Sequence, residues 1–113
     1  MKQYRQGDVL IVQCDPSKLE GTKEKARDNG RIVLAYGEVT GHAHAIHSQK
    51  ATQFYKEGDE NFMSGGTSLL KVDQQVTLTH EEHDPIDLPP GTYEVRRQHE
   101  YQPGPIARRM VED

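Results

Sequence analysis

The chain lacks several residues that commonly stabilise a small protein, because it has one cysteine and no tryptophan. Cys14 alone can form neither an internal disulfide nor a cysteine-rich zinc site. Apolar residues make up 33% of the 113 positions, below the roughly 45–50% of average globular proteins. The sequence therefore predicts one small domain over residues 1–113, whose modest core a bound ion or a partner subunit could supplement.

Long hydrophobic runs and blocks of positive charge are also missing. No window comes near the roughly 18 apolar residues of a membrane span, and no signal peptide is recognisable, so a cytoplasmic protein without a membrane partner is predicted. The net charge of −4 disfavours a broad electrostatic contact with nucleic acid. Local contacts through Arg96, Arg97, Arg108 and Arg109 remain an alternative.

What the chain does have is a series of short β-type segments, separated by turns rich in Gly, Pro and Asp. Seven such segments are Asp8–Gln13, Arg31–Tyr36, His42–Ser48, Thr52–Tyr55, Ser68–Val72, Gln75–His80 and Thr92–Tyr101. No amphipathic stretch is long enough for a regular helix. The pattern predicts an all-β fold, a small antiparallel barrel or sandwich of about seven short strands.

Two segments are predicted to lie outside this strand set. Residues 15–30 are mostly charged and predict a solvated loop, with one helical turn near Lys23–Ala26. Residues 102–113 contain two prolines and predict a tail.

Pairing and side-chain orientation can be predicted for two segments. Alternation in Arg31–Tyr36 puts Ile32, Leu34 and Tyr36 on one side of that strand. The short link "DQ" between Ser68–Val72 and the following segment favours an antiparallel hairpin.

Four of the six histidines form an H-x-H pair and a later H-x-x-H pair, and the first pair lies in "GHAHAIHS". Side chains two residues apart point to the same face of a strand. His42 and His44 therefore share a face with Ile46, and the opposite face carries Ala43, Ala45 and His47. Because Ile46 is apolar, the face of His42 and His44 is predicted to line the interior or a pocket.

The second cluster is "THEEHDP", at the end of the segment that contains Val76 and Leu78. His80 has the same parity as these two apolar residues, which predicts that it points inward. A turn in "EEHDP" could fold His83 back beside His80. Glu81, Glu82 and Asp84 offer carboxylates, as ligands or as acceptors that fix an imidazole tautomer.

Together the two clusters predict a metal site with His42, His44, His80 and His83 as ligands. Imidazole ligands suit a divalent transition metal, Zn first and otherwise Fe, Mn or Ni, better than Ca or Mg. Glu82 or Glu81 is the candidate general base. Two other interpretations stay open: histidines that cap strand ends beside an exposed polar turn, and metal-free acid–base chemistry.

The chain also resembles a family of small uncharacterised bacterial and phage proteins. The resemblance rests on a T-G-H-x-H segment and a later H-E-E-H-x-P-I-x-L-P-x-G-x-Y segment, and it covers nearly the whole chain. The residues that carry it are Gly37, Thr40, Gly41, His42, His44, His80, Glu81, Glu82, His83, Pro85, Pro89, Gly91 and Tyr93. The resemblance implies no activity.

A partial resemblance to cupins rests on Gly37 followed by His42 and His44, and on the later P-x-G motif at Pro89–Gly91. The sequence departs from the cupin pattern at Ser48, where a glutamate is expected, and in having its later histidines before the P-x-G motif. This resemblance implies only a barrel that holds a histidine-rich metal site.

Two functions follow from these observations. The first is a metal-binding small β-barrel protein that acts as a metal-dependent hydrolase. The alternative is a non-catalytic phage or bacterial accessory module in which the histidine cluster is structural and the surface binds a partner. The sequence identifies neither the small molecule nor the macromolecule involved, and a homo-oligomer stays open.

Overall fold

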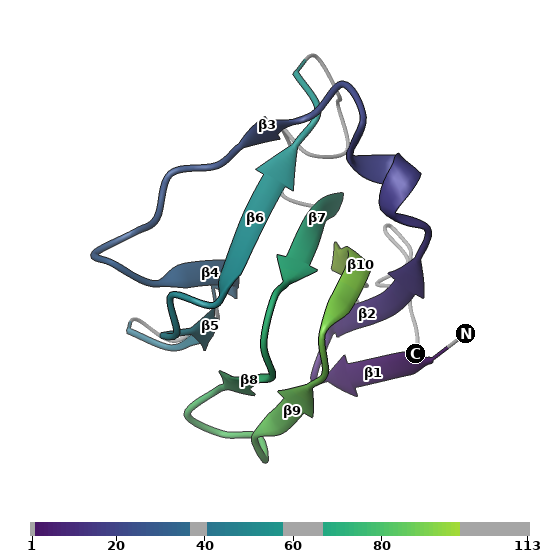
Figure 1. Cartoon of the computed structure of the whole chain (residues 1–113). Coiled ribbons are helices and arrows are strands. Elements are labelled where there is room, and N and C mark those ends of the chain that lie inside the picture. Colours follow the sequence, from purple (N-terminus) through teal and green to yellow (C-terminus); the bar gives the residue numbers. More distant parts are fainter. Residues whose placement is uncertain (1, 37–40, 58–66, 98–113) are drawn as a thin grey trace, which may run out of the picture.

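The computed structural model describes residues 2–36, 41–57 and 67–97, which form ten β-strands and one short 3-10 helix (Figure 1). The elements are β1 (Gln3–Gln6), β2 (Val9–Cys14), η1 (Pro16–Leu19), β3 (Lys23–Glu24), β4 (Ile32–Tyr36), β5 (Ala43–Ile46), β6 (Ala51–Tyr55), β7 (Thr67–Val72), β8 (Val76–Thr79), β9 (Ile86–Leu88) and β10 (Gly91–Arg97). The all-β prediction is confirmed. None of the helical residues in these ranges forms a segment long and apolar enough to cross a membrane.

The strands form two antiparallel sheets. One sheet has six strands in the order β1-β2-β10-β7-β6-β3, and the other has four in the order β4-β5-β8-β9. Figure 1 shows β6, β7, β10 and β2 running side by side in the larger sheet. Both sheets are open, so the sandwich alternative holds and the closed barrel, which the cupin resemblance also implied, is wrong.

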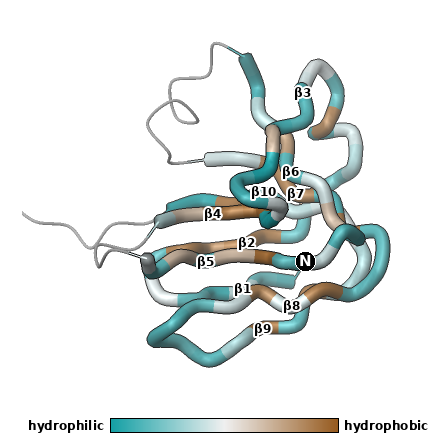
Figure 2. The backbone as a smooth tube through the Cα atoms, turned by 90° about the vertical axis from the view of Figure 1, so that its left-hand side faces the viewer, coloured by the Kyte–Doolittle hydropathy of each residue, from teal (hydrophilic) through white to brown (hydrophobic). Residues whose placement is uncertain are grey.

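One hydrophobic core joins the two sheets. Its fully buried members include Ile11 from β2 and Leu70 from β7 in the larger sheet, and Ile32 from β4, Ile46 from β5 and Leu78 from β8 in the smaller one. Figure 2 shows hydrophobic colour along the strands and hydrophilic colour in many of the connecting loops. The two sheets therefore stabilise each other across a shared interior.

The predicted hairpin between β7 and β8 is wrong, because these strands belong to different sheets. Both edges of β7 are occupied, by β6 on one side and β10 on the other. The link also lacks the positive φ angles of a two-residue hairpin turn. Instead the Asp73 N–H donates to the Lys50 carbonyl, and β8 pairs with β5 and β9.

The predicted alternation in β4 holds only in part. Ile32 and Leu34 pack in the main core and Val33 in a separate buried cluster, as alternation predicts. Ala35, however, also packs in the main core, and Tyr36 is exposed. A register shift in the pairing with β5 lies between Val33 and Ala35, and such bulges interrupt the period of two.

The helical turn expected near Lys23–Ala26 is absent from that position. Lys23–Glu24 instead forms β3 and pairs with β6. The helical turn comes earlier, as η1, where the Asp15 carboxylate accepts a hydrogen bond from the Ser17 N–H. The predicted tail, 102–113, lies outside the described residues.

Candidate metal centre

The structure brings the four predicted histidines into one cluster. The ring centroid of His80 lies 4.3 Å from that of His44, 4.8 Å from that of His83 and 5.8 Å from that of His42. His44 and His83 are stacked at 5.9 Å. The cluster thus joins two motifs that are well separated in sequence, as those motifs predicted.

The predicted faces of the first histidine strand are confirmed. Ile46 packs in the main core, while Ala43 and Ala45 form a separate buried cluster with Val33. His44 is buried on the face of Ile46, and His47 is exposed. Alternation therefore predicts the side-chain directions correctly in this segment, because β5 itself contains no bulge.

The second histidine pair follows β8. Val76 and Leu78 are buried, and His80 continues their parity beyond the last residue of the strand. The bend over residues 81–83 then returns His83 to the His80 ring, as predicted. Short β9 follows this bend and pairs with β8.

Ligand atoms converge at the solvent-facing part of the cluster, which we call the outer site: His42, His80, Glu81 and Glu82. One ligand atom each from His42, His80 and Glu81 lie within 4.8 Å of one another. The Ala43 N–H donates to Glu81 Oε1 at 2.9 Å. This hydrogen bond, together with the backbone N–H of Glu81, lowers the pKa of the Glu81 carboxyl, which is therefore ionised at neutral pH.

Hydrogen bonds constrain both imidazoles of the outer site. His42 Nδ1 lies 2.9 Å from Glu82 Oε2, so it donates its proton to that carboxylate and leaves Nε2 free. His80 Nδ1 accepts the Glu82 N–H at 3.0 Å, so neutral His80 carries its proton on Nε2. Of the two imidazoles in the outer site, only His42 therefore has the tautomer that binds a metal through Nε2.

The other part of the cluster, which we call the inner site, contains buried Gln6 and His44 together with half-buried Asp8 and Arg97. His44 is 3% exposed. Its Nδ1 lies 2.8 Å from Gln6 Oε1, and the Gln6 amide nitrogen donates to the carbonyls of Leu78 at 3.1 Å and Asp84 at 2.9 Å. Burial, and after it the neighbouring His80, lowers the pKa of His44 to about 4. His44 is therefore neutral at pH 7, with Nδ1 protonated.

The unprotonated Nε2 of His44 faces a carboxylate. It lies 3.5 Å from Asp8 Oδ1, while Asp8 Oδ2 accepts a hydrogen bond from Arg97 Nε at 2.9 Å. Partial burial raises the pKa of Asp8, but the hydrogen bond and charge of Arg97 outweigh it and the pKa is lowered overall. Asp8 is thus a carboxylate held between a guanidinium group and a neutral imidazole.

The tight turn between β1 and β2 brings Gln6 and Asp8 to the histidines. Gln6 pairs with Val9, which leaves Gly7 and Asp8 as a two-residue loop. Gly7 has a φ of 59°, and a Cβ there would lie 2.7 Å from His83 Nε2 and 3.3 Å from His44 Cε1. Glycine is thus required both by the turn conformation and by the close approach of the imidazoles.

The structure therefore divides the predicted ligand set. His42 and His80 belong to the group whose ligand atoms converge, and within the described residues that group is completed by Glu81 and not by His44 or His83. The roles of the histidines as ligands and of Glu81 and Glu82 as general bases stay predictions. Sequence reasoning missed Gln6, Asp8 and Arg97.

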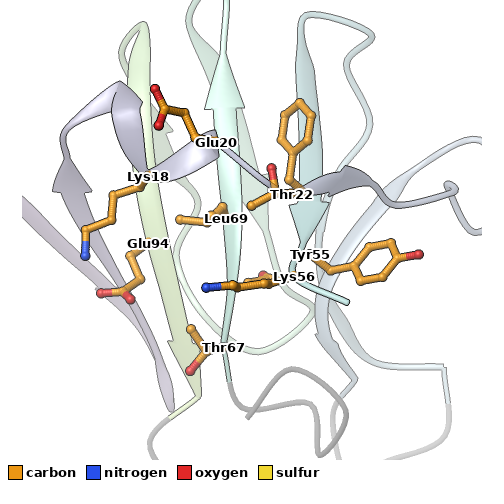
Figure 3. Close-up of a pocket in the computed structure, with 10 residues that line it drawn as sticks. Lys18, Glu20, Thr22, Tyr55, Lys56, Thr67, Leu69 and Glu94 are labelled. Atoms are coloured by element: carbon orange, nitrogen blue, oxygen red, sulfur yellow. The ribbon is translucent and has the colours of Figure 1, made fainter. Parts of the chain in front are cut away.

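A separate hollow of about 210 Å³ lies against the outer face of the six-stranded sheet (Figure 3). Phe54, Leu69 and Glu94 are cross-strand neighbours on its floor, and Lys18 and Lys56 contribute to its lining. It contains no histidine and is smaller than the roughly 300 Å³ at which small-molecule pockets usually begin. The histidine cluster is the stronger candidate site.

Comparison with known proteins identifies a family but no activity. No curated protein and no solved structure matches the chain. A family model described as a domain of unknown function, DUF8820, matches residues 5–98, which include the whole histidine cluster with Gln6, Asp8 and Arg97. Because this match covers most of the chain, the protein belongs to the DUF8820 family.

Proposed function

We propose that the protein binds a divalent transition metal at the outer site and acts as a metal-dependent hydrolase. The observation that carries this proposal is the convergence of ligand atoms from His42, His80 and Glu81 within 4.8 Å. Two imidazoles and a carboxylate are a ligand set found in catalytic zinc sites, which keep a further position open for water or substrate. We further propose that the two histidine motifs mark this site in the family.

The donor set fits Zn²⁺ best among the expected ions, with Fe, Mn or Ni as alternatives. Two ligands of a tetrahedral ion lie about 3.4 Å apart for bond lengths of about 2.1 Å. The outer-site atoms, which lie within 4.8 Å of one another, must therefore draw together by up to about 1.4 Å. Glu81 is exposed, and its side chain can make this movement without disturbing the core.

Binding through His80 also requires one hydrogen bond to break. The Glu82 N–H must leave His80 Nδ1, because a neutral imidazole that binds metal through Nε2 carries its proton on Nδ1. This exchange costs about 1 kcal/mol at an exposed position. Structural zinc ions contribute roughly 10–16 kcal/mol in small domains, so the cost does not oppose binding.

A bound ion of this kind lowers the pKa of water toward neutrality and polarises a carbonyl or phosphoryl group. The role of the neighbouring side chains is to orient the metal ligands. Glu82 accepts the Nδ1 proton of His42 and holds that ring in the tautomer that binds metal. In this proposal Glu81 is a ligand, and Glu82 acts as a positioning residue. The substrate or partner stays open, as do the cytoplasmic location and the homo-oligomer.

The test is metal analysis of the chain purified without a histidine tag. We expect stoichiometric metal in the wild type and its loss in His42→Ala, His80→Ala and Glu81→Gln. His47→Ala is the matched control, because His47 directly follows β5 as His42 directly precedes it, and His47 is exposed. A folded wild-type protein that takes up no transition metal would overturn the proposal.

The alternative function, a non-catalytic module in which the ion is structural, is favoured by a different observation. The cluster joins the four-stranded sheet, through His44 and His80, to the turn of the larger sheet that carries Gln6 and Asp8. Thermal unfolding with and without chelator separates the two functions. A large fall in Tm on chelation favours the structural ion, whereas an unchanged Tm with full loss of metal favours the open, catalytic site.

A further inference from the structure

In the inner site two possible ligand atoms, His44 Nε2 and Asp8 Oδ1, face each other. Gln6 turns its amide nitrogen toward two carbonyl oxygens, so it offers His44 only an acceptor oxygen. His44 must donate its Nδ1 proton there, which leaves a lone pair on Nε2. That lone pair lies 3.5 Å from Asp8 Oδ1.

The other contacts of the two side chains keep these atoms facing each other. Arg97 Nε donates to Asp8 Oδ2 at 2.9 Å, which turns Oδ1 toward His44. The lone pair of a neutral His44 ring facing a carboxylate oxygen is electrostatically unfavourable, and His44 is buried with only 3% of its surface exposed. Buried polar atoms are nearly always satisfied. A cation bound by both atoms would satisfy them together.

We propose that His44 Nε2 and Asp8 Oδ1 bind a second divalent transition-metal ion, distinct from the ion of the outer site. For bond lengths of about 2.0–2.2 Å and a tetrahedral angle, two ligands of one ion lie about 3.3–3.6 Å apart. The observed 3.5 Å falls within this interval without any movement of either side chain. His83, whose ring stacks on His44, supplies a third donor by rotation of its exposed side chain.

The surroundings of this pair match those of metal ligands in proteins. A ligating histidine usually donates its other N–H to a carbonyl or carboxylate oxygen, as His44 does to Gln6. Arg97 occupies Asp8 Oδ2, which fixes the carboxylate and leaves Oδ1 as a single ligand atom. Because the His80 ring contacts both His42 and His44, the two ion positions flank His80.

Native mass spectrometry of the full-length, untagged chain during titration with Zn²⁺ tests this proposal. The wild type should bind two ions, Asp8→Asn one, Glu81→Gln one and the double variant none. The affinity lost in Asp8→Asn should exceed the roughly 10–100-fold lost when only a supporting residue of a metal site is removed. Arg97→Gln is the control, since it removes the partner of Oδ2 but keeps the ligand atom Oδ1, and it should still bind two ions.

Two outcomes overturn the second site: an Asp8→Asn variant that binds as many ions as the wild type, or an Arg97→Gln variant that loses an ion as Asp8→Asn does. Loss of one ion in Asp8→Asn with no loss in Glu81→Gln would instead support the inner ion and refute the outer site of the proposed function. Should Asp8→Asn fail to fold, Co²⁺ titration of the wild type and of Glu81→Gln decides. Visible absorption should saturate at two equivalents in the wild type and at one in Glu81→Gln, and a Glu81→Gln variant that binds no Co²⁺ rejects the inner ion.

Discussion

The outer and inner sites both combine imidazole and carboxylate groups, but they differ in how firmly these groups are held. In the outer site, Glu81 and Glu82 are exposed and His80 is held by a single backbone hydrogen bond. In the inner site, His44 is buried and its tautomer is fixed by an amide that is itself fixed by two carbonyls. The outer site can therefore adjust to an ion, whereas the inner site already has the spacing that an ion requires.

Gln6→Leu should break the inner site most severely. It leaves the buried Nδ1–H of His44 without its acceptor and removes the Gln6 donor from the Leu78 carbonyl, each at about 1–3 kcal/mol. We expect the free energy of unfolding to fall by about 4 kcal/mol in urea titrations with chelator present. Gln3→Leu, at an exposed position of the same strand, is the control and should change it little. A loss below about 1 kcal/mol for Gln6→Leu would show that the amide does not fix His44.

The stability of the metal-free protein should fall with acidification because of His44. Its pKa is about 4 in the folded chain, below the ordinary histidine value of 6.5 that applies to the unfolded chain, so the unfolded chain binds more protons between these values. Stability is full above pH 6.5 and declines as the pH falls toward 4, by about 3 kcal/mol at 1.36 kcal/mol per pKa unit. His44→Gln should flatten this slope, whereas His47→Gln should keep it. Equal slopes in all three proteins would refute the assignment.

Gly7→Ala should perturb the packing of the β1–β2 turn against His83 and His44, with a smaller effect. The positive φ costs about 1 kcal/mol for alanine, and the new Cβ also crowds His83 Nε2. Gly21→Ala is a matched control, because Gly21 has a φ of 76° with nothing within 4 Å of its Cβ position. Thermal unfolding should show a loss of about 2 kcal/mol for Gly7→Ala and about 1 kcal/mol for Gly21→Ala. Equal losses would mean that His83 simply moves aside.

Glu82→Gln should have the smallest effect and should act on the outer site alone. It replaces the carboxylate that holds His42, which should weaken Zn²⁺ binding there about tenfold. Calorimetric titration measures this change, and the stability of the metal-free protein should be unaltered. An unchanged affinity would remove the orienting role proposed for Glu82.

The histidine cluster was predictable from sequence because alternation held where the strands are regular. The parity of Ile46 and of Leu78 correctly brought the rings of buried His44 and half-buried His80 together. Alternation failed only at the end of β4, where a bulge shifts the register and no residue type in the segment signals it. The predicted pairing of β8 with β7 was also wrong. The short link between the two strands does not reveal that β6 and β10 already occupy both edges of β7.

The inner site could not be predicted in the same way. Gln6 belongs to β1, whose sequence "QYRQ" lacks apolar alternation and so gives no signal of a buried face. The turn at Gly7 was recognisable, but what that turn faces depends on long-range packing. The chemistry of Asp8 likewise depends on Arg97 and His44, which reach it only in the folded chain.

The inner site also has a consequence for the order in which the protein is made. Asp8 and Arg97 lie 89 residues apart in the sequence, and Gln6 donates to the carbonyl of Asp84, 78 residues downstream. A ribosome delivers the first half of each pair long before the second, so a nascent chain can hold neither His44 nor Asp8 in its final geometry. The inner site is therefore completed only after β10 has been synthesised and has paired with β2.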